Sequence, residues 1–193
     1  YAAYWERIRQ HASTHDDAAT MAPRLEDDDE WAEKLDALIR SRTPVVSFTF
    51  GLPSPDVFRR LKTAGILTIQ TVTSVDEARR AAAAGADALT VQGYDAGGHS
   101  GVWDADTFPE NVPLATLVER VRTVTDLPLI ASGGITRRDQ VREVLDAGAD
   151  MVAVGTAVLR SGESGASATH KGALVDERYT ETTLTRAFTG RPA

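Results

Sequence analysis

Two segments of this sequence almost repeat each other, and together they restrict the fold more than any other feature. Residues 84–91 read AGADALTV and residues 147–154 read AGADMVAV. In each segment the glycine follows a helical pattern, which it can end in a left-handed conformation. An apolar stretch typical of a buried parallel strand comes next. A helix, a glycine stop and a buried strand are the repeating parts of a parallel α/β fold.

The same alternation of strand and helix patterns extends over most of the chain. The expected strands cover residues 45–49, 66–72, 88–92, 127–131 and 151–154, and the helices between them cover 53–64, 74–84, 113–125 and 136–147. Ser74 and Glu77 form a capping-box pattern at the start of one helix. The repeated turn favours a (β/α)8 TIM barrel over an open doubly wound sheet. Because a closed barrel needs eight strands, we expect only the C-terminal five βα units here, without the first three strands.

The sequence predicts one partial TIM-barrel domain over residues 1–193. Residues 1–44 form a helical lead-in, with helices at 1–11 and 30–42, and residues 45–193 carry the βα units and the site. Further helical segments are expected at 155–160, 166–175 and 180–189. Because five strands alone would leave sheet edges and apolar faces uncovered, we expect either a longer parent molecule or a second chain to supply the remaining strands.

Composition excludes several classes of partner and site. The net charge of −7 argues against nucleic acid and anionic membranes, which need basic patches. There is no cysteine, so disulfides and Cys-ligated metals are excluded, and a cytoplasmic location is compatible. No metal site is expected: the acidic run at 27–30 is typical of a solvated helix start, and His11, His15 and His170 lack ligand spacing. No apolar run reaches 18 residues.

Three of the expected strands end in residues that suggest a binding site. In a (β/α) barrel, active sites form at the carboxyl ends of the strands. A loop reading QGYDAGGHSG at 92–101 contains a histidine, which titrates near neutrality. The later turns, at 132–134 and 155–156, each precede a helix, so their backbone amides can bind a phosphate. The alternative is an ordinary loop with an incidental histidine, and glycines that only permit tight turns. The candidate residues are Gln92, Gly97, His99, Ser132, Gly133, Gly134, Gly155 and Thr156.

Other signatures of catalysis or nucleotide binding are missing from the sequence. No G-x-G-x-x-G motif follows a first strand, and there is neither a P-loop nor a G-x-S-x-G nucleophile elbow. The GESG segment at 162–165 lies in a late connection and is expected to be a plain loop.

QGYDAGGHSG at 92–101, ASGGI at 131–135 and VGTA at 154–157 occur in that order and resemble the nitronate monooxygenases, formerly called 2-nitropropane dioxygenases. VVSFTFG at 45–51 and the tail TETTLTRAFTGRP at 180–192 are similar to the same family. One departure is Asp95, where the family commonly has glutamate. The resemblance implies a barrel that binds FMN non-covalently and oxidises alkyl nitronates with O2 to carbonyl compounds and nitrite.

The resemblance also implies roles for single residues. His99 would be the catalytic histidine, which takes the α-proton of a nitroalkane or holds a nitronate anion. Gln92 and Gly97 would line the flavin, with Ser132 as a further contact, and its phosphate would be bound by Gly133, Gly134, Gly155 and Thr156. Trp103 and Phe108 would either cap a substrate pocket or simply pack the loop. The partners would be the nitronate and O2, and a homodimer is one option for the oligomeric state.

The sequence is also compatible with two other interpretations of its function. An FMN-dependent enoyl-acyl-carrier-protein reductase is similar in the same loop and glycine turns, but it needs a reduced nicotinamide. An incomplete, non-catalytic relative is the other alternative, because the first barrel strands, which form part of the flavin wall in this family, are not visible in the sequence.

Overall fold

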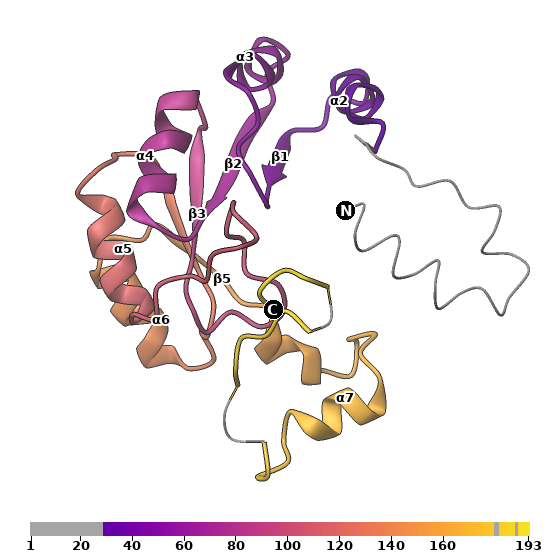
Figure 1. Ribbon diagram of the computed structural model, residues 1–193, viewed down its shortest axis with the longest axis vertical. Coiled ribbons are helices and arrows are strands. Elements are labelled where there is room, and N and C mark those ends of the chain that lie inside the picture. The colour runs from indigo at the N-terminus through magenta and orange to yellow at the C-terminus, as the bar shows by residue number, and fades with distance from the viewer. Residues whose placement is uncertain (1–28, 180–181, 188) are drawn as a thin grey trace, which may run out of the picture. The chain divides into compact units, whose positions relative to one another are not determined.

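The computed structural model describes residues 29–179, 182–187 and 189–193 (Figure 1). The helix expected at 1–11 lies outside the described residues. The chain divides into two compact units, residues 1–41 and 42–193. In the first unit, α2 (Trp31–Arg40) confirms the helix expected at 30–42.

The second unit is built on a parallel sheet of five strands. These are β1 (Val45–Phe48), β2 (Leu67–Val72), β3 (Ala88–Gln92), β4 (Leu129–Ser132) and β5 (Met151–Ala153). They lie in the order β1-β2-β3-β4-β5, and every neighbouring pair is parallel. A doubly wound sheet reverses its strand order, whereas a barrel adds each strand beside the last one. The unit is therefore a partial (β/α) barrel, as the sequence predicted.

Four helices lie against one face of this sheet (Figure 1). They are α3 (Pro55–Thr63), α4 (Val75–Ala84), α5 (Leu114–Arg122) and α6 (Arg138–Asp146). Strand residues that point towards the helices are buried, including Leu89 and Leu129 at 0% exposure. Side chains alternate along a strand, so the next residues point to the other face. There Val45, Leu67 and Met151 are 43%, 58% and 49% exposed. In a closed barrel, this second face lines the interior.

The near-repeat AGAD has a structural role in joining neighbouring strands. Gly85 and Gly148 take φ angles of 103° and 105°, as helix ends require. Asp87 Oδ2 then accepts hydrogen bonds from the amide and the hydroxyl of Thr68, at 2.9 and 2.8 Å. Asp150 Oδ2 accepts one from the amide of Leu129 at 2.8 Å. Each repeat therefore ends a helix and binds the start of the adjacent strand.

The capping box at the start of α4 forms in part. Ser74 Oγ accepts a hydrogen bond from the amide of Glu77 at 3.2 Å, as expected of an N-cap. The Glu77 carboxylate, however, accepts from the amide and the hydroxyl of Thr73, at 2.6 and 2.9 Å. This carboxylate therefore fastens the end of β2 to the helix.

The segments after β5 differ in part from the expectation. Short helices form at η2 (Thr156–Arg160) and α7 (Ala168–Ala173). The helix expected at 180–189 is wrong for its described residues, because the backbone of Thr185 exchanges two hydrogen bonds of 3.0 Å with that of Ala193. Gly190 at φ 81° turns the chain back, and β-branched threonines favour extended backbone over helix. Each helix of the described residues is too short or too polar to cross a bilayer.

Candidate functional site

The carboxyl ends of three neighbouring strands form the floor of a cavity. The register pairs Gln92 with Ser132 and Ser132 with Ala153, so their side chains point to the same face. The cavity has a volume of about 370 Å³, within the range of small-molecule sites. Its lining includes all seven residues that the sequence predicted for the cofactor: Gln92, Gly97, Ser132, Gly133, Gly134, Gly155 and Thr156.

The glycines bring the three strand ends close enough to touch. Gly134 has a φ of 69°, and a Cβ placed on it would lie 2.8 Å from Asp95 Cβ. A Cβ on Gly133, whose φ is 105°, would lie 3.1 Å from Ala96 Cβ. A Cβ on Gly97 would overlap the hydroxyl of Thr156. The structure therefore leaves no room for side chains at these three positions.

The same two turns present free backbone amides. The amides of Gly133, Gly134, Ile135, Gly155 and Thr156 donate no hydrogen bond within the described residues. The next amides along the chain, those of Thr136 and Arg137, are already bound by Gln140 Oε1 at 2.9 and 3.0 Å. Free amides at adjacent strand ends can together bind an anion. No lysine or arginine lines the cavity in the described part of the chain, so such an anion would be held mainly by backbone.

His99 is absent from the residues that line the cavity. Its Nε2 lies 2.8 Å from Thr189 Oγ1, and its ring meets that of Phe50 edge-on at 6.0 Å between centroids. The Gln92 side chain holds the backbone around it, because Nε2 donates to the His99 carbonyl at 3.3 Å and Oε1 accepts from the Gly101 amide at 2.6 Å. Gln92 therefore connects the cavity floor to the histidine loop, residues 92–101.

The two loop aromatics have packing contacts, and neither of them lines the cavity. The backbone amide of Trp103 donates to Glu77 Oε1 and its indole N–H to the Thr71 carbonyl, each at 3.0 Å. The guanidinium of Arg80 lies 5.0 Å from the Trp103 ring. Phe108 is covered by the guanidinium of Arg186 at 4.6 Å. Trp103 thus fixes the loop that follows the histidine to the start of α4.

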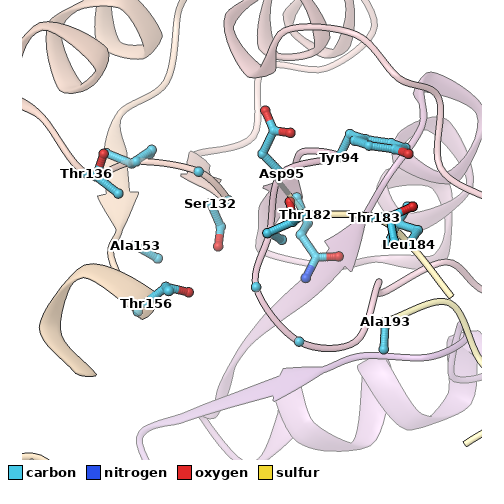
Figure 2. A pocket seen from close by; sticks show the side chains of 18 residues that line it. Tyr94, Asp95, Ser132, Thr136, Ala153, Thr156, Thr182, Thr183, Leu184 and Ala193 are labelled. Atoms are coloured by element: carbon cyan, nitrogen blue, oxygen red, sulfur yellow. The ribbon is translucent and has the colours of Figure 1, made fainter. Parts of the chain in front are cut away.

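The C-terminal tail supplies site residues that the sequence reasoning missed. Figure 2 shows Ser132, Ala153 and Thr156 at one side of the cavity and Thr183, Leu184 and Ala193 at the other. Their only signal in the sequence was the family likeness of residues 180–192. The described residues contain no group of three His, Asp or Glu side chains placed to hold a metal.

Comparison with known proteins gives this site its context. The nitronate monooxygenase family matches residues 3–193. This chain belongs to the nitronate monooxygenase family. A probable nitronate monooxygenase of Staphylococcus aureus (strain MSSA476) is 38% identical over 174 residues, which cover 88% of this chain and 48% of that protein. Another, from strain JH9, is 40% identical over 163 residues, covering 82% and 45%. The chain spans about half the length of these curated nitronate monooxygenases.

Solved structures give the same picture for this nitronate monooxygenase homologue. A nitroalkane oxidase from Streptomyces ansochromogenes superposes with a TM-score of 0.82 at 41% sequence identity, over 98% of this chain and 56% of that one. FabK from Thermotoga maritima superposes with a TM-score of 0.72 at 29% identity, over 98% and 58%.

Proposed function

We propose that this chain carries the flavin-binding half of an enzyme that oxidises alkyl nitronates with O2, forming carbonyl compounds and nitrite. The observation that carries the proposal is the set of five free amides at two adjacent glycine turns, which can together bind an anionic ligand. The family match and the similarity to a nitroalkane oxidase support the same reaction class.

The residues around the cavity fit FMN as the cofactor. The turns at Gly133–Gly134 and Gly155–Thr156 offer amides for the phosphate, and Gly133 and Gly134 leave no room for a side chain beside Ala96 and Asp95. Gln92, Gly97 and Ser132 lie on the floor and wall, where the rest of the flavin would contact them. When bound, FMN supplies the electron acceptor for the oxidation.

His99 is assigned the proton chemistry in this proposal. With a neutral nitroalkane, the imidazole takes the α-proton, and the electron pair of the broken C–H bond passes to the nitro group to give the nitronate. With a nitronate already formed, an imidazole N–H holds the anion. Gln92 fixes the backbone of His99 through its carbonyl, so the imidazole is carried by a constrained loop.

Oxygen uptake with 1-nitropropane and FMN tests the assignment, because this neutral nitroalkane must first lose its α-proton. His99→Asn should lower turnover at least about 100-fold, while the FMN content per chain stays the same. The matched control is His170→Asn, because His170 lies on α7 and outside the cavity lining, so this variant should keep full turnover. Equal turnover of His99→Asn and the parent chain would refute the role of His99.

The similarity to FabK keeps the enoyl-acyl-carrier-protein reductase as the second candidate. NADH and NADPH oxidation in the presence of an enoyl thioester separates the two functions. The proposed oxidase consumes O2 with nitronates and shows no thioester-dependent oxidation of a nicotinamide. The opposite pattern would assign the reductase reaction to this site.

A further inference from the structure

The imidazole of His99 has one engaged nitrogen and one open nitrogen. Nε2 lies 2.8 Å from the hydroxyl oxygen of Thr189, a residue 90 positions further along the chain. Nδ1 has no hydrogen-bond partner within the described residues. The Phe50 ring meets the imidazole edge-on, with an angle of 78° between the ring planes. The two nitrogens therefore face different chemical surroundings.

A hydroxyl oxygen can accept a hydrogen bond from Nε2–H in the neutral tautomer protonated at Nε2 and also in the imidazolium, because both of these forms carry that proton. If the hydroxyl donated to Nε2 instead, it would occupy a lone pair, and this bond would have to reverse when the ring became an imidazolium. Only the first arrangement persists unchanged while the ring gains a proton. That arrangement leaves the lone pair on Nδ1.

We propose that Thr189 is a positioning residue that accepts a hydrogen bond from His99 Nε2–H and thereby makes Nδ1 the atom that receives the substrate proton. This inference rests on the proposed function, since it names the reacting atom of the same histidine. In the step, the substrate C–H bond breaks, an Nδ1–H bond forms, and the electron pair stays with the substrate as a nitronate. The imidazolium that results still donates its Nε2–H to Thr189.

The structure holds Thr189 in place through its neighbours on the tail. The Arg191 guanidinium donates to the Val102 carbonyl at 3.2 Å and stacks on the Phe50 ring at 4.8 Å. The Ser100 amide donates to the Pro192 carbonyl at 2.8 Å. These contacts join the tail to the residues next to His99, so Thr189 and His99 are carried by segments that are fixed to each other. A hydrogen bond to one ring nitrogen of a histidine decides which of the two nitrogens carries the proton.

Nitrogen NMR of the 193-residue chain, labelled with ¹⁵N in its histidines, tests the proposal without flavin or substrate. The signals of His99 are identified by their loss in His99→Asn, and circular dichroism reports whether each variant is folded. At a pH where the imidazole is neutral, we expect Nε2 to be protonated and Nδ1 to be unprotonated. Thr189→Val should lower the ratio of this tautomer to the other about two- to tenfold, and Thr189→Ser should restore it.

Thr185→Val is the matched control. It removes a hydroxyl from the same tail, but this hydroxyl accepts a hydrogen bond from the Ala187 amide and does not contact His99. It should leave the tautomer ratio unchanged. A protonated Nδ1 in the parent chain, or an equal ratio in Thr189→Val, would overturn the proposal. The NMR measurement needs no turnover, so its result is independent of the oxidase assay. The tautomer prediction can be wrong while His99→Asn still abolishes oxygen uptake, and it can be right for a chain that oxidises no nitronate.

Discussion

Replacement of Gly134 by alanine tests the close approach that forms the phosphate cradle. Gly134 has a φ of 69°, and its new Cβ would lie 2.8 Å from Asp95 Cβ. The left-handed conformation costs an alanine about 1–2 kcal/mol, and overpacking against the histidine loop adds about 1–3 kcal/mol. The free energy of unfolding should therefore fall by about 2–5 kcal/mol in Gly134→Ala.

Gly65→Ala is the matched control for this prediction. Its φ of 75° is similar, but nothing lies within 4 Å of the added Cβ, so only the conformational cost of about 1–2 kcal/mol applies. Urea unfolding followed by circular dichroism measures both variants. An equal loss of stability in the two would refute the steric argument and would mean that the strand ends are not in contact at Gly134.

Three further substitutions test contacts around the site and the tail. Glu77→Gln should lower the free energy of unfolding in urea by about 1–2 kcal/mol. One carboxylate oxygen of Glu77 accepts from the Thr73 amide at the end of β2 and the other from the Trp103 amide, whereas a glutamine has a single acceptor oxygen. An unchanged free energy of unfolding would contradict this prediction. Arg122→Met should lower the free energy of unfolding by about 2–3 kcal/mol, because the guanidinium donates to the carbonyls of three residues and to one carboxylate. An unchanged urea midpoint of unfolding would contradict this prediction. Hydrogen bonds from the Arg178 side chain and backbone hold the pKa of Asp176 below its usual 3.8, so any stabilisation is present above that pH and is lost as the pH falls through the lowered pKa. In Arg178→Gln the NMR titration midpoint of Asp176 should rise, and a midpoint that stays in place would contradict this cause.

Most of the fold could be predicted because its signals are local. The AGAD repeat, the glycine stops and the apolar strands are all legible in short windows, and the five expected strands match the five described ones. The tail helix was wrong because the pairing of Thr185 with Ala193 is decided by contacts outside any single helical turn. The sequence pattern predicted a capping box with Ser74 and Glu77, but the Glu77 carboxylate accepts from the amides of Thr73 and Trp103 and not from the Ser74 amide.

The site could be predicted to a smaller extent. Glycines at strand ends are recognisable from the sequence, and the structure places all seven candidate cofactor residues around one cavity; their binding role stays a prediction. The partner of His99 could not be predicted, because Thr189 is 90 residues away and the family likeness of its segment does not say which side chain its hydroxyl contacts. The same holds for the tail residues that line the cavity, which only tertiary structure brings to the strand ends.

Titration of the purified 193-residue chain with FMN, followed by flavin absorbance and fluorescence, tests whether the two glycine turns bind the flavin phosphate. We expect saturable binding of one FMN per chain through the amides of the two glycine turns. In Gly134→Ala the affinity should fall about tenfold or more, a change of about 1.4 kcal/mol or more in binding free energy, while Gly65→Ala binds like the parent chain. A chain that takes up no FMN, or a Gly134→Ala variant with undiminished affinity, would contradict the claim that these strand ends form the flavin site.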